Sequence, residues 1–205
     1  MPVSNWLSWF EQRSMVVRKV VTVEARQLFR LDNEVLAFRF TATMSDRASG
    51  APQERLSSHG RLKLWFHAAG LGVPDVSPAE LQNALSLREA IYRAGLAVTA
   101  TQRPDPGDAA ILNKAATAGQ SRPALDGNGI AVWNLSKEAP VRDALGVLAA
   151  DAIHVLGGPD RDRIKACEGP GCAGLFLDTS RGANRRWCSM NTCGNRVKKA
   201  RIANK

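Results

Sequence analysis

The sequence lacks the residue patterns on which the common enzyme classes depend. It contains no glycine-rich phosphate loop, no serine nucleophile elbow and no pair of carboxylates at a recognisable spacing. Histidines are few and far apart, and none adjoins a cysteine or another histidine, at His59, His67 and His154. Isolated histidines of this kind are more typical of an ordinary core or surface than of a ligand set. We therefore expect a protein that is not an enzyme.

Long hydrophobic runs are absent as well. No stretch reaches the roughly 18 consecutive apolar residues that a membrane-spanning helix needs. The segment from Met1 to Phe10 has no basic region followed by an apolar core, as a secretory signal would. These absences predict a soluble, cytoplasmic protein with no membrane partner.

Cysteine is scarce, and its placement is informative. The four cysteines all lie in the last 39 residues, as Cys167-x4-Cys172, a gap of 15 residues and Cys188-x4-Cys193. Two close pairs of thiolates on turns can surround Zn²⁺ tetrahedrally at about 2.3 Å. Glycine and proline between the first two cysteines allow the backbone to curl around an ion. The spacing predicts one structural Zn²⁺ ion held by all four cysteines.

Other uses of the four cysteines remain open at this stage. They could form two disulfides, stay as ordinary thiols or hold an iron–sulfur cluster. The lack of a secretory signal speaks against disulfides, and the spacing fits zinc better than a cluster.

Positive charge is concentrated in the same segment. Residues 161–205 contain 11 lysines and arginines against 3 acidic residues, whereas residues 1–160 contain 17 against 16. A basic surface on a small, metal-stiffened module is typical of a polyanion-binding protein, and a solvated basic tail is the simpler alternative. The candidate nucleic-acid contacts are Arg181, Arg185, Arg186, Arg196, Lys198, Lys199 and Arg201.

The residues around the cysteines resemble the CGNR zinc finger family. The segments that carry the resemblance are Cys-Glu-Gly-Pro-Gly-Cys at 167–172, Leu-Phe-Leu-Asp-Thr-Ser-Arg at 175–181, Arg-Arg-Trp-Cys-Ser-Met at 185–190 and Cys-Gly-Asn-Arg at 193–196. In that family the finger follows an ABATE domain, and the pair is described as a stress-induced transcription regulator. The resemblance implies a DNA-binding regulator that responds to stress.

Within the module the sequence predicts a strand, a turn and a helix. The apolar run at 173–178 predicts a strand that buries Leu175 or Phe176 beside the metal. Trp187 is expected to cover the metal cluster rather than to stack on a base. A helix is expected at 194–203, capped by Asn191 or Thr192, with its free N–H groups directed at the thiolates. These parts predict a treble-clef-like or ribbon-like zinc finger with a basic loop and a basic helix.

Helical signals dominate the rest of the chain. Capping residues, proline at first helical positions and apolar residues at helical spacing predict helices at 58–69, 78–97, 105–119 and 139–156. Short apolar segments at 123–125 and 130–133 flank Asp-Gly-Asn-Gly and predict a hairpin. The predicted fold class is α+β, a mostly helical N-terminal domain with a small antiparallel sheet, followed by the zinc finger.

The predicted domain division follows composition and charge. Residues 1–30 form an N-terminal extension of unknown role, residues 31–158 an ABATE-like helical domain, and residues 160–205 the CGNR-type zinc finger. The joint is expected where an apolar helix meets Gly157, Gly158 and Pro159.

The resemblance to the ABATE domain centres on residues 36–43. The family signature is a strand that ends in Asp-Phe-x-Asn-Thr; this segment keeps Phe40 and Thr43 but has Arg39 in place of the acid and Ala42 in place of the amide. If that strand lines an effector pocket in the family, the pocket of this chain is altered.

These patterns favour a zinc-dependent, DNA-binding transcription regulator. The ABATE-like domain would sense a small-molecule effector or form a homodimer, which one short finger with few phosphate contacts would need for specific binding. Two alternatives remain: a finger that binds structured RNA, or a redox-sensing or protein-interaction module whose thiolates release zinc on oxidation.

Overall fold

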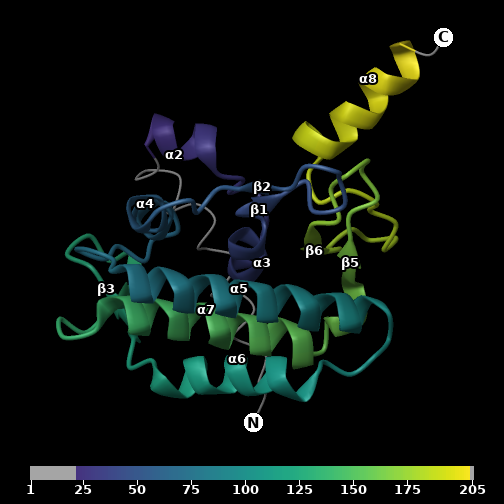
Figure 1. Cartoon of the computed structure of the whole chain (residues 1–205). Coiled ribbons are helices and arrows are strands. Elements are labelled where there is room, and N and C mark those ends of the chain that lie inside the picture. The colour runs from purple at the N-terminus through teal and green to yellow at the C-terminus, as the bar shows by residue number, and fades with distance from the viewer. Residues whose placement is uncertain (1–21, 204–205) are drawn as a thin grey trace.

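Four helices occupy the positions that the sequence patterns predicted (Figure 1). The structure is a computed structural model and describes residues 22–203. Helix α5, Pro78–Thr99, begins with a capping box between Ser77 and Glu80, and α6, Pro106–Ala118, is capped by the Asp105 side chain. The other two are α4, His59–Ala68, and α7, Pro140–Gly157. The four predicted helices are confirmed.

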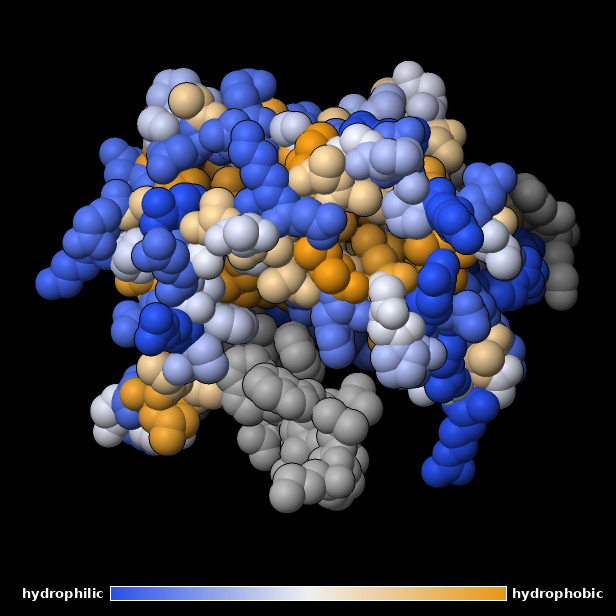
Figure 2. All heavy atoms as spheres, turned by 90° about the horizontal axis from the view of Figure 1, so that it is seen from below, coloured by the Kyte–Doolittle hydropathy of each residue, from blue (hydrophilic) through white to orange (hydrophobic). Residues whose placement is uncertain are grey.

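Helices α5, α6 and α7 pack side by side and form the base of the molecule in Figure 1. At the end of α6, a Cβ added to Gly146 of α7 would lie only 2.6 Å from the Cα of Gly119. The two backbones therefore approach as closely as glycine permits. On the face of the molecule seen from below, hydrophobic side chains reach the surface among polar ones (Figure 2). The helical layer is therefore not fully covered on that side.

Short antiparallel hairpins accompany the helices. Strand β1, Met44–Ser45, pairs with β2, Gln53–Glu54, and β3, Arg122–Leu125, pairs with β4, Ala131–Asn134. In the β3–β4 turn, the Asp126 carboxylate accepts backbone N–H groups from Asn128 at 2.9 Å and Ile130 at 2.8 Å. The hairpin predicted at 123–133 is confirmed.

The prediction of a strand at residues 36–43 is wrong, because this segment forms helix α3, Leu36–Thr41. All six of its residues are buried, so the apolar run reflects burial on every side, which periodicity cannot assign to a strand or a helix. Arg39 donates from its guanidinium to the backbone carbonyls of Asn33 and Glu34, and burial lowers its pKa below the ordinary arginine value. At this departure from the family signature, the arginine side chain is therefore bonded to the backbone of the segment just before α3.

The described part of the N-terminal extension consists of Thr22, helix α2, Val23–Leu28, and the two residues that follow it. Thr22 caps α2, and Ala25 and Phe29 are buried in the main hydrophobic core. The rest of the extension predicted at 1–30 lies outside the described residues. No helix within residues 22–203 is long and apolar enough to cross a membrane.

The cysteine-bearing segment is built onto the end of the helical layer (Figure 1). After α7 the chain makes a short 3₁₀ turn, Arg161–Arg163, and enters β5, Ile164–Ala166, which pairs with β6, Leu175–Leu177. A π-helical turn, Met190–Gly194, then leads into α8, Asn195–Ala203. The predicted strand and helix of the module are both present. Ile164 and Leu175 belong to the same hydrophobic core as the long helices, so the module is packed onto the body.

Candidate metal centre

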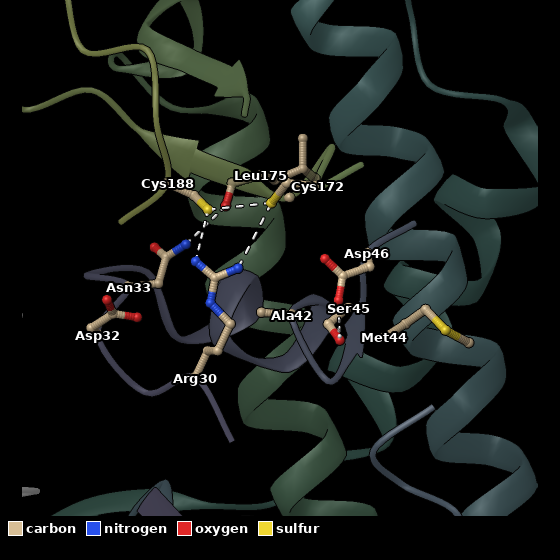
Figure 3. Close-up of a pocket in the computed structure, with 11 residues that line it drawn as sticks. Arg30, Asp32, Asn33, Ala42, Met44, Ser45, Asp46, Cys172, Leu175 and Cys188 are labelled. Carbon is tan, nitrogen blue, oxygen red and sulfur yellow. Dashed lines mark hydrogen bonds between the residues drawn. The ribbon is translucent and has the colours of Figure 1, made fainter. Parts of the chain in front are cut away.

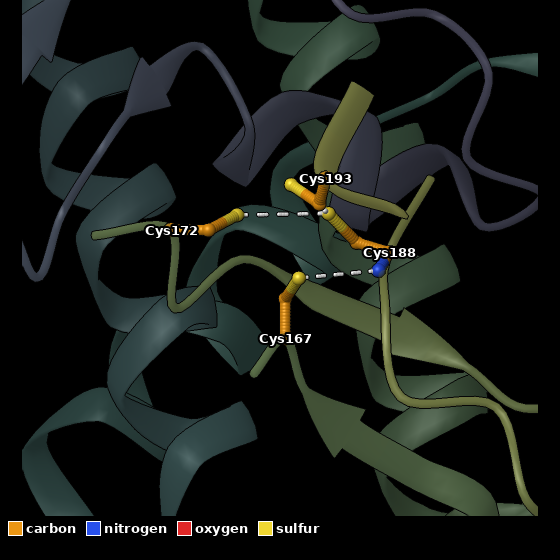
Figure 4. A group of neighbouring side chains, drawn as sticks. All are labelled: Cys167, Cys172, Cys188 and Cys193. Carbon is orange, nitrogen blue, oxygen red and sulfur yellow. Dashed lines mark hydrogen bonds between the residues drawn. The ribbon is translucent and has the colours of Figure 1, made fainter. Parts of the chain in front are cut away.

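The four cysteine sulfurs converge on one point in the module (Figure 4). All four residues are buried, and their sulfurs lie within 4.8 Å of one another. Cys188 Sγ is 3.6 Å from Cys172 Sγ and 3.8 Å from Cys193 Sγ. Tetrahedral zinc with Zn–S bonds of about 2.3 Å requires S···S edges of about 3.8 Å. The donor set therefore fits one zinc ion, which these four cysteines would hold.

Crowding also explains why the sulfurs need a cation. Hydrogen bonding with the neighbouring sulfurs, that of Cys167 first, raises the pKa of Cys188 and of Cys193 above the ordinary thiol value and lowers the pKa of Cys172 below it. Four thiolates so close together repel one another, and a divalent ion at the centre removes that repulsion. Ionisation of the tetrad and metal binding are therefore coupled.

The first cysteine pair sits on a tight turn between β5 and β6. Cys167 N–H donates to the Gly174 carbonyl and Cys172 N–H to the Gly169 carbonyl, both at 2.9 Å. A Cβ at Gly169 would lie 2.9 Å from the Cβ of Cys193. Glycine inside the first pair is therefore needed so that the second pair can approach.

The second pair spans the π-helical turn, and its capping differs from the prediction. The side chain of Ser189 accepts the Thr192 N–H at 3.3 Å, so Ser189 takes the role expected of Asn191 or Thr192. The π-helical turn places residues 190–194 ahead of α8, which moves the cap toward the N-terminus.

The backbone donors to sulfur also differ from the prediction. Gly169 and Cys188 donate their N–H groups to Cys167 Sγ at 3.4 and 3.3 Å, and both residues precede α8. The expectation that α8 itself supplies these donors was wrong. Backbone donors of this kind orient a thiolate and reduce its charge.

An aromatic layer encloses the tetrad. Phe176 is completely buried beside the cysteines, and the half-buried Trp187 packs against the same cluster. This arrangement confirms the expectation that Trp187 covers the metal cluster. Apolar cover of this kind limits the access of water to the sulfurs.

A buried carboxylate organises the loop that connects the two pairs. Asp178 is fully buried and accepts from Lys165 Nζ at 2.6 Å, the Arg185 N–H at 2.9 Å and the Ser180 N–H at 3.0 Å. Burial acts to raise the pKa of Asp178, but Lys165 and Ser180 outweigh it and hold the pKa well below the usual range. The loop is therefore closed around an ionised side chain.

Three of the seven predicted nucleic-acid contacts have partners within the protein. Arg185 donates to the carbonyls of Trp187 at 2.9 Å and Cys188 at 2.7 Å, and its guanidinium lies over the ring of Phe176. The other two pair with acidic residues: Arg186 with Glu168 at 2.5 Å and Arg196 with Asp46 at 3.0 Å. Arg185 in particular holds the second cysteine pair in place.

The other four predicted contacts point into solvent. Within residues 22–203 their side chains form no ion pair or hydrogen bond, and all are exposed: Arg181, Lys198, Lys199 and Arg201. Three of them lie on α8, which has no buried residue and extends away from the rest of the molecule in Figure 1. Even Ile202 on this helix is 65% exposed. Beyond its first turn, where Arg196 pairs with Asp46, helix α8 is therefore exposed to the surroundings.

Backbone carbonyls of the module are bound by side chains of the body. Asn33 Nδ2 donates to the Leu175 carbonyl at 2.8 Å, and the Tyr92 hydroxyl of α5 donates to the Ala173 carbonyl at 3.0 Å. The Leu175 side chain fills the space above Gly95 of α5, where an added Cβ would lie 2.3 Å from it. The position of the metal centre is thus set by α5.

One residue of the site escaped the sequence analysis. Arg30 directs its guanidinium at the cysteine sulfurs (Figure 3). It lies 158 positions before Cys188, its nearest sulfur partner. No spacing rule links positions so far apart, and an isolated arginine carries no signal of its own.

Comparison with known proteins agrees with the resemblance drawn from the residues. A family model with the description "ABATE: Putative stress-induced transcription regulator" matches residues 34–159. A model of the CGNR zinc finger matches residues 163–205. No curated protein matches the chain.

Proposed function

Because the chain belongs to the ABATE family and ends in a CGNR zinc finger, we propose that it is a zinc-dependent, DNA-binding transcription regulator. In this proposal the protein acts in the cytoplasm in response to stress and has no catalytic activity. The ABATE domain serves as the sensor or dimerisation domain.

The observation that carries the proposal is the exposure of helix α8. The helix has nine residues, none of them buried, and it has no acidic residue in its first turn. A helix so short is marginal in water unless it packs against something. Arg196 of this helix pairs with Asp46, but within residues 22–203 the side chains of Lys198, Lys199 and Arg201 have no partners. A polyanion would supply the counter-charges that this helix lacks.

The dimensions favour duplex DNA over duplex RNA. A helix of nine residues is about 14 Å long, and the major groove of B-form DNA, about 12 Å wide, admits an α-helix. The major groove of A-form RNA is too narrow and deep for side chains to read. We therefore assign α8 to the DNA major groove, with Arg181 on the adjacent backbone.

The number of unpaired cations sets the strength of DNA binding. Arg181, Lys198, Lys199 and Arg201 are the unpaired cations among the predicted contacts, and each phosphate neutralised contributes about 0.9 to the slope of log K against log salt. Four contacts give a slope of about −3.6 per finger, which corresponds to weak binding. Specific recognition then requires two fingers, so a homodimer belongs to the proposal.

The test compares two sets of substitutions that remove the same charge. The test variant is Lys198→Gln/Lys199→Gln/Arg201→Gln, and the control is Arg103→Gln/Arg122→Gln/Lys137→Gln on exposed positions of the body. Anisotropy of a labelled random duplex across a salt series should show a slope about 2.7 units shallower for the test variant and an unchanged slope for the control. If both sets of substitutions change the salt slope equally, α8 is excluded as the DNA contact. Preferential competition by structured RNA at equal salt would favour an RNA-binding role instead.

A further inference from the structure

Arg30 is held in place by the segment that precedes it. Thr22 caps α2, and Ala25 and Phe29 are buried in the main core, so the backbone of Arg30 leaves the body at a fixed point. From there its half-buried side chain reaches across to the cysteines, with both terminal nitrogens facing the sulfurs (Figure 3). Arg30 Nη2 is 3.0 Å from Cys188 Sγ and 3.9 Å from Cys193 Sγ, and Nη1 is 3.7 Å from Cys172 Sγ.

The cysteine sulfurs differ in the hydrogen-bond donors that they receive. Cys167 Sγ receives the backbone N–H groups of Gly169 and Cys188. Within residues 22–203, no backbone N–H donates to Cys188 Sγ or Cys193 Sγ, and the donor outside the tetrad for both is Arg30. Cys188 and Cys193 therefore depend on this side chain, which also approaches Cys172 Sγ.

The charges of the two partners are complementary. Zn²⁺ with four thiolates carries a net charge of −2 in a buried site, and a buried charge is costly unless it is paired. Arginine keeps its positive charge at every pH that a protein experiences. Within residues 22–203 the hydrogen bonds of this guanidinium go from Nη1 and Nη2 to cysteine sulfurs, and its buried Nε has no hydrogen-bond partner. Without Arg30 the negative charge of the metal centre would be poorly compensated, and without the metal centre the positive charge of Arg30 would be.

We propose that Arg30 is a positioning residue of the metal centre, supplied by the body, which orients Cys188, offsets half of the tetrathiolate charge and makes metal retention depend on the docking of the module. Arg30 lies outside both segments that the family models match, residues 34–159 and 163–205. The inference therefore concerns this chain's own extension, and it does not depend on DNA binding.

The inference predicts how the thiolates behave when Arg30 is changed. A thiolate that loses a charged donor gives electron density to its metal more readily and is displaced or protonated more easily. In protein substituted with Co²⁺, the sulfur-to-metal charge-transfer absorption should therefore move to lower energy in Arg30→Met. Loss of metal to a chelator should also become faster, because removal of an outer partner of a metal ligand usually lowers the metal affinity about 10-fold or more.

The test uses the full chain in three variants. Arg30→Met removes the charge, Arg30→Lys keeps it, and Arg103→Met removes an equal charge from an exposed position of the body. We expect a band shift and fast metal loss in Arg30→Met, an intermediate behaviour in Arg30→Lys, and the behaviour of the unsubstituted protein in Arg103→Met. If Arg30→Met does not fold, the band position of Arg30→Lys decides in its place.

Two results would overturn the inference. An unshifted charge-transfer band in a folded Arg30 variant would mean that the guanidinium does not act on the sulfurs, even if thermal stability fell. A band shift of the same size in Arg103→Met would mean that the net charge of the protein, rather than Arg30, governs the centre.

Discussion

Replacing Asp178 with asparagine should loosen the loop between the two cysteine pairs. The change leaves the shape of the buried side chain nearly intact but removes its charge. The ion pair with Lys165 at 2.6 Å is lost, and an amide N–H₂ now faces one of the donors that the carboxylate accepted. One charge-assisted hydrogen bond and one unsatisfied donor correspond to a loss of about 2 kcal/mol. For a protein of this size that lowers the melting temperature by roughly 4–8 °C.

The pH dependence of this loss follows from the lowered pKa of Asp178. A carboxyl group whose pKa is lower in the folded than in the unfolded protein stabilises the fold above the unfolded pKa of about 3.9. That stabilisation disappears only as the pH falls through the folded pKa. The difference in melting temperature between the two proteins should therefore be constant from pH 5 to pH 8.

The assay is thermal unfolding of the metal-loaded protein, with Asp162→Asn as the control. Asp162 is an exposed acidic residue of the same module, and its substitution removes the same charge. A melting temperature unchanged in Asp178→Asn, or a difference that already narrows at pH 6, would refute the role given to the ionised Asp178.

Two further substitutions test the centre and the helical layer. Cys188→Ser should abolish the binding of one equivalent of metal, measured by colorimetric titration. It should also lower the melting temperature of the body, because Leu175 of the module is part of the body core. Retention of a full equivalent of metal would contradict the ligand set. Gly146→Ala should lower the free energy of unfolding by about 2–3 kcal/mol in denaturant, because its Cβ would lie 2.6 Å from the Cα of Gly119. Gly127→Ala, the control, has open space around the added Cβ and should cost little. Equal losses of stability in the two variants would contradict the close packing of α6 on α7.

The features that were predictable from the sequence are those with local signals. The capping box of α5, the hairpin turn after β3 and the spacing of the cysteines each depend on residues a few positions apart. The helix at 36–41 was mistaken for a strand because burial on all sides removes the periodicity that distinguishes the two.

Long-range pairing is what the sequence could not supply. Arg196 and Lys198 look equivalent in the sequence, yet Arg196 pairs with Asp46, which lies 150 positions away, while Lys198 faces solvent. The same holds for Arg30, whose role exists only because the segment after α2 reaches the metal centre in space. Which cations are available to a partner is a property of the packed structure.

The central claim is that a bound metal organises a surface for DNA. The most direct measurement is anisotropy of a labelled random duplex with the full chain, across a salt series, before and after the metal is removed by chelation. We expect salt-sensitive binding by the metal-loaded protein that is lost on removal of the metal and returns when zinc is restored. Binding that is absent at low salt, or that is unchanged after the metal is removed, would contradict it.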